Sequence, residues 1–147
     1  MKSKEVASLI EAAFADIPIP SGQITYLGDD EGAQEYFCGT HWSSHTTKSL
    51  RSHDAALHFF MPEAWRYYLP AYMMAVLNDP EEADILSEYI VWQFSQNPMD
   101  TNDFTEKLGL LTAPQKSAIL AFISYENNLC EGCFEFDLKK VTEILGD

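Results

Sequence analysis

Apolar residues near the start of the chain recur with the spacing of one helical face. The i, i+3, i+4, i+7, i+8 pattern aligns side chains along a single stripe of an α-helix. Ser3 is of a residue type that favours the N-cap. Pro18 and Pro20 end the helix before them, because proline cannot continue a regular helix. The stripe comprises Val6, Leu9, Ile10, Ala13 and Phe14.

The next forty residues show no comparable stripe. Ile24–Tyr26 is a short extended piece that leads into a glycine- and acid-rich turn at 28–32. Residues 33–38 predict one brief helical turn closed by Gly39, since glycine readily adopts the left-handed conformation that ends helices. Ser, Thr and His dominate 40–53, which is typical of loops and short turns.

The segment 62–77 predicts the central helix of the core. Pro62 suits the first helical position, and Glu63 beside it complements the helix dipole. Pro70 should kink this helix or divide it into two abutting helices. Tyr67 lies opposite the apolar stripe, so we expect it to be exposed. The stripe comprises Trp65, Tyr68, Leu69, Tyr72, Met73, Val76 and Leu77.

The chain breaks at Asn78–Pro80 and can restart as a helix over Glu81–Tyr89. Ile90–Phe94 alternates like a strand, yet it could also finish that helix, and five residues of periodicity leave both alternatives open. A loop is expected at 96–101, around Pro98.

The strongest local signal lies in the last third of the chain. Thr112 with Gln115 forms a capping box, which predicts a helix to about Tyr125. A short helix over 103–108 should precede it and turn at Gly109. A final amphipathic helix, capped by Asp137, is indicated by Leu138, Val141, Ile144 and Leu145.

These elements predict a mainly α fold: a single compact domain over residues 1–147, with about six helices and at most a small strand pair. Hydrophobic residues make up 46% of the chain, which is enough to build a core. No apolar run approaches the ~20 residues needed to span a bilayer, and the N-terminus lacks the apolar stretch of a signal peptide. We therefore expect a cytoplasmic protein.

The chain is strongly acidic, with 23 Asp and Glu against 9 Lys and Arg and a net charge of −14. Such a charge argues against nucleic acid and membranes as partners, because phosphates need a basic footprint. Eight acids and no Lys or Arg lie in 79–106. All four histidines and both arginines lie between positions 41 and 66.

The acidic segment predicts a binding surface for a basic, toxin-like protein, because opposite charge steers association. The alternative is that the acids only keep the protein soluble. Arg66 could pair with carboxylates of this segment or, with the neighbouring aromatics, form a hot spot for a partner. The predicted partner-binding residues are Asp79, Glu81, Glu82, Asp84, Glu88 and Tyr67.

The histidines suggest the other class of function, a metal-binding protein or hydrolase using the region from His41 to His58. His41 and His45 are four residues apart, but the Ser and Thr between them disfavour the helix that would bring them to one metal. No nucleophile elbow or glycine-rich oxyanion turn accompanies them. We therefore predict no enzyme, no catalytic residue and no cofactor.

Three cysteines, an odd number, favour reduced thiols in the cytoplasm. Cys130 and Cys133 have the spacing of a redox or zinc motif, and Cys38 with His41 could complete a zinc site if the segments met. Buried or incidental thiols are the simpler interpretation, so no metal site is predicted.

The stretch Pro62–Met73 resembles the signature of an uncharacterised bacterial family, catalogued as a domain of unknown function. A helix like Ile10–Phe14, the pair His41–Trp42 and the later Leu111–Gln115 segment fit the same family. The resemblance covers roughly residues 6–126 and leaves out the Cys130/Cys133 pair. It implies no catalytic residues. Small acidic bacterial proteins of this sort are similar to immunity proteins that neutralise secreted toxins, which is an analogy and not a motif match.

Overall fold

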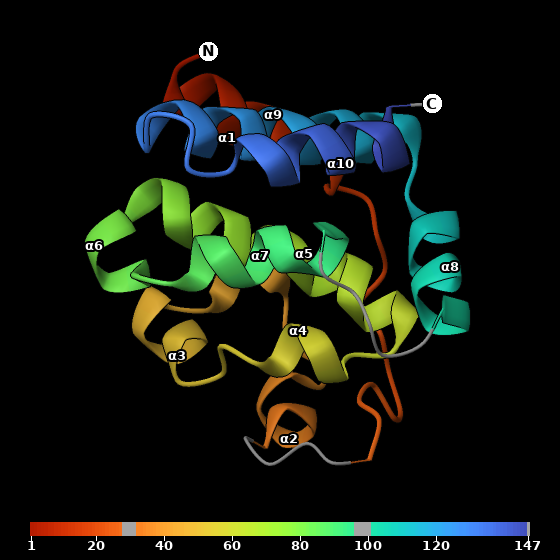
Figure 1. Cartoon of the computed structure of the whole chain (residues 1–147). Helices are drawn as coiled ribbons and strands as arrows, with labels where there is room; N and C mark the ends of the chain where they lie inside the picture. Colours follow the sequence, from red (N-terminus) through yellow and green to blue (C-terminus); the bar gives the residue numbers. More distant parts are fainter. Residues whose placement is uncertain (28–31, 96–100, 147) are drawn as a thin grey trace.

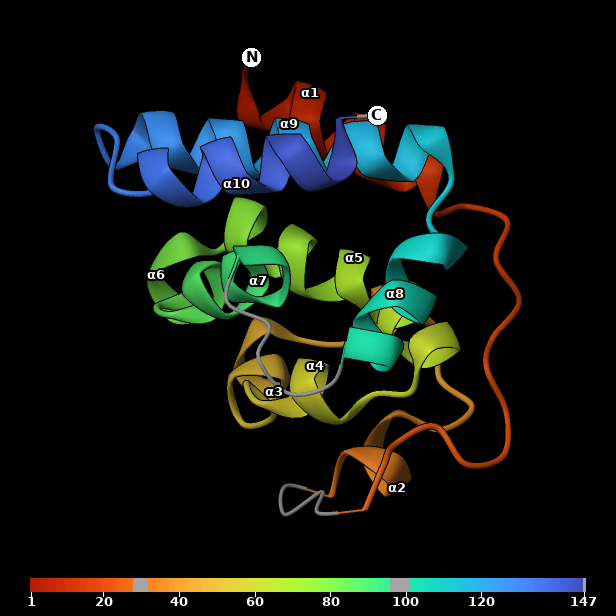
Figure 2. The ribbon, with the colours of Figure 1, turned by 45° about the vertical axis from the view of Figure 1, so that its right-hand side comes forward.

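Helices account for almost all regular structure in the computed structural model, which describes residues 1–27, 32–95 and 101–146. Three helices form an upper layer across one side of the molecule, and the others pack beneath and beside it (Figures 1 and 2). The described residues form ten α-helices, where about six were predicted, and six of the ten have ten or more residues. The mainly α prediction is confirmed. No described helix is long and apolar enough to cross a bilayer.

The upper layer consists of α1 (Ser3–Ala13), α9 (Ala113–Leu129) and α10 (Glu135–Leu145). Thr112 and Gln115 form the predicted capping box at the start of α9. The amide of Gln115 also donates to the carbonyl of Ala13 at 3.1 Å, which ties α9 to the end of α1. The helix runs four residues past the predicted end at Tyr125.

Two predicted caps are wrong. The N-cap of α1 is Lys2, with Ser3 as the first helical residue. The N-cap of α10 is Phe134, which places Asp137 inside the first turn, where its charge still complements the helix dipole.

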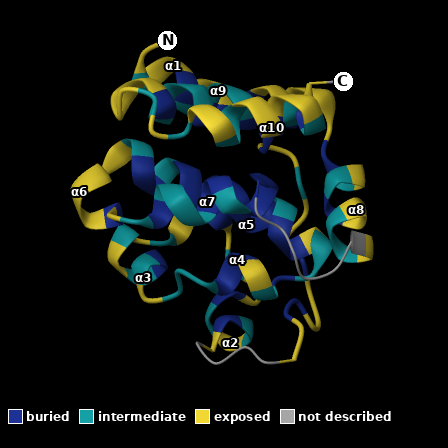
Figure 3. Ribbon diagram, in the orientation of Figure 1, coloured by how far each residue is buried: buried dark blue, intermediate teal, exposed yellow. Residues whose placement is uncertain are grey.

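The central helix α5 (Pro62–Asn78) lies between the upper layer and the elements below (Figure 1). It continues through Pro70 as one helix, so a division into two helices is wrong. The expectation that Tyr67 is exposed is also wrong, because only 1% of this residue is accessible. Neighbours surround α5 on nearly every side and bury 11 of its 17 residues (Figure 3).

The acidic segment folds into α6 (Pro80–Ala83), α7 (Leu86–Ser95) and α8 (Thr101–Leu110). The single helix predicted for Glu81–Tyr89 is interrupted at Asp84, whose φ of 49° turns the chain. Ile90–Phe94 lies within α7, so the helical alternative is confirmed. Residues 96–100 of the predicted loop lie outside the described residues, and residue 101 already begins α8, which continues through Gly109.

The lower part contains α2 (Ala33–Phe37), a 3₁₀ turn η1 (Trp42–Ser44), α3 (Thr47–Arg51) and α4 (Ala56–Phe59). Gly39, with a φ of 79°, closes the turn after α2 as predicted. Thr25, within the predicted extended piece, forms an isolated antiparallel β-bridge with Phe60. Residues 28–31 of the predicted turn lie outside that part of the chain.

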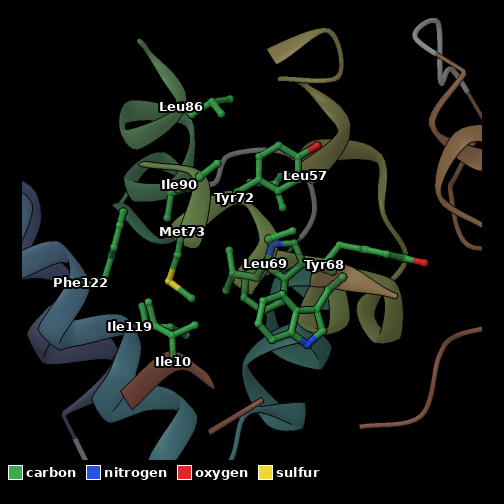
Figure 4. Packing of buried hydrophobic residues seen from close by; sticks show 14 of the residues in the cluster. Ile10, Leu57, Tyr68, Leu69, Tyr72, Met73, Leu86, Ile90, Ile119 and Phe122 are labelled. Carbon is green, nitrogen blue, oxygen red and sulfur yellow. The ribbon is translucent and has the colours of Figure 1, made fainter. Parts of the chain in front are cut away.

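The core is one cluster that joins the layers. Met73 of α5 lies close to the upper-layer residues Ile119 and Phe122 and to Ile90 of α7 (Figure 4). All four side chains are fully buried, and such burial contributes about 1.5–3 kcal/mol for each large apolar side chain. A shared core of this kind gives the elements that carry the candidate site a rigid support.

Candidate functional site

Four of the predicted partner-binding acids are exposed together at the edge of the molecule that carries α6 (Figures 1 and 3). The fifth, Glu88, is half-buried on α7. Ala83, 1% exposed, anchors α6 to the core, so its other side chains face solvent. We call the exposed set the acidic corner: Asp79, Glu81, Glu82 and Asp84.

Arg51 of α3 pairs with one member of the acidic corner. Its guanidinium lies 3.0 Å from the carboxylate of Asp84 and donates to the carbonyl of Glu82 at 3.3 Å. These contacts fix the end of α6. Within the described residues, no ion pair involves Asp79, Glu81 or Glu82, so these three carboxylates keep their charge facing solvent.

The far end of the acidic segment is an internal ion pair. Lys107, which is 2% exposed, lies 2.9 Å from the carboxylate of Asp103, and Tyr26 donates to the same carboxylate at 2.6 Å. The ammonium also lies 5.7 Å from the ring centre of Trp65. Burial lowers the pKa of Lys107, and Asp103 opposes that shift. The segment 79–106 is therefore not one continuous acidic surface.

Arg66 does not meet the carboxylates expected for it. Its guanidinium donates to the carbonyl of Leu110 at 3.3 Å, and among the described residues it forms no ion pair. Arg66 therefore joins α5 to the end of α8, because the last carbonyls of a helix lack partners within the helix.

His45 belongs to a saturated hydrogen-bond chain in the lower part. Thr40 Oγ1 donates to the carbonyl of Phe37 at 2.6 Å, so its lone pairs accept from His45 Nε2 at 2.8 Å. His45 Nδ1 then accepts from the hydroxyl of Tyr36 at 2.9 Å. This assigns the neutral Nε2–H tautomer. Burial lowers the pKa of His45, and the nearby His53 lowers it further.

The other two inner histidines are also engaged by neighbours. His53 Nδ1 lies 2.9 Å from the carbonyl of Ser49, and its ring stacks on Tyr36 with centroids 4.3 Å apart. His58 Nδ1 lies 3.4 Å from the amide nitrogen of Gln93. These contacts support a scaffolding role for this part of the region.

His41 differs, because it is exposed; with His45 it lines an open pocket of about 440 Å³. Its ring stacks on Trp42 at 5.6 Å. Nδ1 accepts from the amide of Ser43 at 3.1 Å and lies 2.8 Å from the Ser43 hydroxyl. We call this the His41 pocket. Four parts of the chain line it: α1 with the segment just after it, η1 with the histidine on either side, the start of α3, and the second half of α5. The lining residues are Glu11, Ala15, His41, Trp42, Ser43, His45, Thr47, Ala71, Met74, Ala75 and Asn78.

The cysteines do not gather in one place. Cys130 and Cys133 form a disulfide in the turn between α9 and α10, so the expectation of three reduced thiols is wrong for this pair. Cys38 is free and exposed after α2, on the opposite side of the molecule (Figure 1). Cys38 therefore lies far from the Cys130/Cys133 turn, and the two segments do not meet to form the zinc site considered for them. Across residues 1–27, 32–95 and 101–146, no three His, Cys, Asp or Glu side chains are grouped as metal ligands.

Fold and site together define an acidic all-α protein whose described residues form the exposed acidic corner and the His41 pocket. The chain belongs to a family of unknown function, DUF6714, whose model matches residues 2–141. This match confirms the resemblance to such a family and extends it beyond residue 126, across the disulfide turn. No curated protein and no solved structure matches the chain.

Sequence reasoning missed two contributors to the His41 pocket. Glu11 lies off the apolar stripe predicted for the first helix, and Asn78 lies at the predicted break after the central helix; both are exposed, and the structure brings both to the rim of one open pocket. No local pattern relates positions so far apart in the chain. The pair His41–Trp42, noted within the family resemblance, was the one available signal.

Proposed function

We propose that this chain is a protein-binding protein that takes a basic protein partner, in the manner of an immunity protein that neutralises a toxin. The observation that carries the proposal is the acidic corner. Asp79, Glu81 and Glu82 present three carboxylates without ion-pair partners in the described residues. Asp79 is the N-cap of the short helix α6 and the other two lie on it, and the helix is held by Arg51 and by the buried Ala83.

A fixed cluster of like charge favours an oppositely charged partner in two ways. It raises the association rate by steering, and it needs little reordering on binding, which lowers the entropic cost of forming the interface. The net charge of −14 extends the same field over the whole molecule.

The test is the affinity for the protein encoded by the neighbouring gene, measured by calorimetry at low and high salt. The variant Glu81→Lys/Glu82→Lys should bind at least ~10-fold more weakly, since each lost charge pair contributes on the order of 1 kcal/mol or more. Its affinity should also depend less on salt.

The matched control is Glu106→Lys/Glu143→Lys, which reverses two exposed acids on α8 and α10, away from α6. It changes the net charge equally and should leave most of the affinity intact. If both variants bound the partner equally weakly, the loss of affinity would come from the overall charge and not from the acidic corner. If the Glu81/Glu82 variant bound as tightly as wild type, the proposed binding role of the acidic corner would be contradicted.

A second candidate function is a hydrolase at the His41 pocket, and one observation favours it. Ser43 Oγ lies 2.8 Å from His41 Nδ1, within the reach a base needs to activate a hydroxyl. The ordinary alternative is that His41 only caps η1 through the Ser43 amide. Hydrolysis of p-nitrophenyl acetate by wild type and Ser43→Ala separates the two: equal rates leave only the cap. Elemental analysis of the purified protein tests the metal-binding version.

A further inference from the structure

We propose that the His41 pocket receives a cationic side chain, an arginine or lysine, from the basic partner. Glu11 is the one Asp, Glu, Lys or Arg among the residues that line the pocket. Burial and the nearby His53 lower the pKa of His45, also in the lining, and so favour its neutral ring. With both lining histidines, His41 and His45, counted as neutral, the formal charge of the pocket is that of Glu11 and is negative.

The position of the pocket adds to that potential. Ala75 and Asn78 of its lining belong to the last turn of the 17-residue helix α5. The C-terminal end of a helix carries a partial negative charge, which favours cations. An anionic ligand would face Glu11 and this helix end with no Lys or Arg in the lining to balance it.

The lining also suits the shape of a long basic side chain. Ala71, Met74 and Ala75 supply apolar surface for the methylene stem. Ser43 and Thr47 supply hydroxyl oxygens, and oxygens at several positions can accept from the five N–H donors of a guanidinium. At about 440 Å³ the pocket falls within the size range of small-ligand sites.

The pocket adjoins the acidic corner along the chain. Asn78, in its lining, is followed directly by Asp79, the first residue of the corner. A basic partner held at Asp79, Glu81 and Glu82 therefore has a receiving pocket next to it for one of its own side chains. This inference rests on the proposed function for the identity of the partner, while the pocket is tested without that partner.

The probes are N-acetyl-arginine amide and N-acetyl-citrulline amide, which share nearly the same shape and differ in charge. Binding is followed by two-dimensional ¹H–¹⁵N NMR, including the indole signal of Trp42. We expect saturable shifts at Trp42 and Asn78 with the arginine compound and at least ~5-fold weaker binding of citrulline, because a charged hydrogen bond is roughly twice as strong as a neutral one.

Glu11→Gln should weaken binding of the arginine compound by about the same factor, because it removes the charge and keeps the shape. Glu5→Gln, an exposed change on the same helix outside the pocket lining, is the matched control and should leave binding unchanged. Equal binding of the two compounds, no effect of Glu11→Gln, or no shift at Trp42 would each overturn the inference.

The two proposals fail separately. If arginine amide does not enter the pocket but the Glu81→Lys/Glu82→Lys variant loses the neighbouring gene product, the acidic corner stands and the pocket inference is overturned. If arginine amide binds through Glu11 but the charge reversal has no effect, the pocket stands and the acidic corner is contradicted.

Discussion

The lower part and the upper layer each contain a half-buried ionisable side chain, but only the one in the lower part has hydrogen-bond partners for its ionisable group. In the lower part, His45 is half-buried and both ring nitrogens have hydrogen-bond partners. In the upper layer, Glu126 of α9 is also half-buried, but its carboxylate forms no hydrogen bond or ion pair within the described residues. Burial raises its pKa from 4.5 to about 7.

The difference teaches that burial alone does not fix what a titratable group contributes to stability. A partnered group stabilises the fold in the protonation state that its partners require. An unpartnered carboxylate loses hydration and gains nothing in return, so its charged form destabilises the fold. Removing a group of the first kind should therefore cost stability, and neutralising one of the second kind should add it.

The largest effect is expected at Lys107, the most deeply buried partnered charge. Lys107→Met fills similar space but leaves Asp103, whose side chain is 15% exposed, without its ion pair. Loss of one member of a buried pair costs about 3 kcal/mol or more, and urea unfolding monitored by fluorescence measures it.

The matched control for Lys107 removes both charges. Asp103→Asn/Lys107→Met should lose clearly less than Lys107→Met alone, because no buried charge is left unpaired. A loss below about 1 kcal/mol for the single variant would show that water reaches Asp103 freely.

Elements with a local hydrogen-bond signal were predictable from the sequence. The capping box at Thr112 and Gln115 and the proline at the start of α5 were both confirmed, because their causes lie within a few residues. The break at Asp84 was missed. Asp84 combines a φ of 49° with a ψ of −110°, outside the left-handed helical region that aspartate visits through local hydrogen bonds, and its carboxylate pairs with Arg51 of α3, more than thirty residues earlier in the chain.

Burial of Tyr67 and assembly of the His41 pocket could not be predicted for a related reason. Periodicity identifies the most apolar face of a helix, but it does not say how many neighbours will surround the helix. Tyr67 is buried, and its hydroxyl accepts from the Trp42 amide at 3.4 Å, a residue 25 positions away in the chain. The pocket likewise joins Glu11 and Asn78 through tertiary packing.

His45 should give the next largest effect, with a dependence on pH. His45→Phe keeps an aromatic ring but removes the bonds to Tyr36 and Thr40, at a cost of about 2 kcal/mol near pH 7.5. Because burial lowers its pKa from 6.5, the contribution of His45 is present above pH 6.5 and is lost as pH falls through the lower folded value.

The difference between wild type and His45→Phe should therefore shrink in acid, as measured by urea unfolding from pH 4.5 to 8. Tyr36→Phe, which removes one of the two bonds, should cost about half as much near neutrality. A difference that stays constant over this range would mean that packing, and not the neutral hydrogen-bonded ring, accounts for the loss.

Glu126 should behave with the opposite sign. Its raised pKa means that the favourable contribution is complete below about pH 4.5 and is lost as pH rises through about 7. Glu126→Gln should therefore be more stable than wild type above pH 7, by roughly 1–2 kcal/mol once partial exposure is allowed for, and close to wild type near pH 4.

Thermal unfolding at pH 4 and pH 8 tests this expectation. Glu143→Gln, an exposed neutralisation on α10, is the control and should shift the unfolding temperature little at either pH. Destabilisation of Glu126→Gln at pH 8 would reveal a partner for the carboxylate and would abolish the contrast with His45.

The smallest effect is expected at the exposed pair between Arg51 and Asp84, whose side chains are 33% and 60% accessible. Asp84→Asn should cost only about 0.5 kcal/mol, and the loss should fade in 1 M salt, because exposed ion pairs are weak and screened. Asp84→Gly loses the same ion pair, but glycine adopts a φ of 49° without the strain that a side chain causes. Asp84→Gly should therefore be at least as stable as wild type. If Asp84→Asn instead cost as much as Lys107→Met, pairing and not burial would decide the energy, and the acidic corner would depend on Arg51 for its shape.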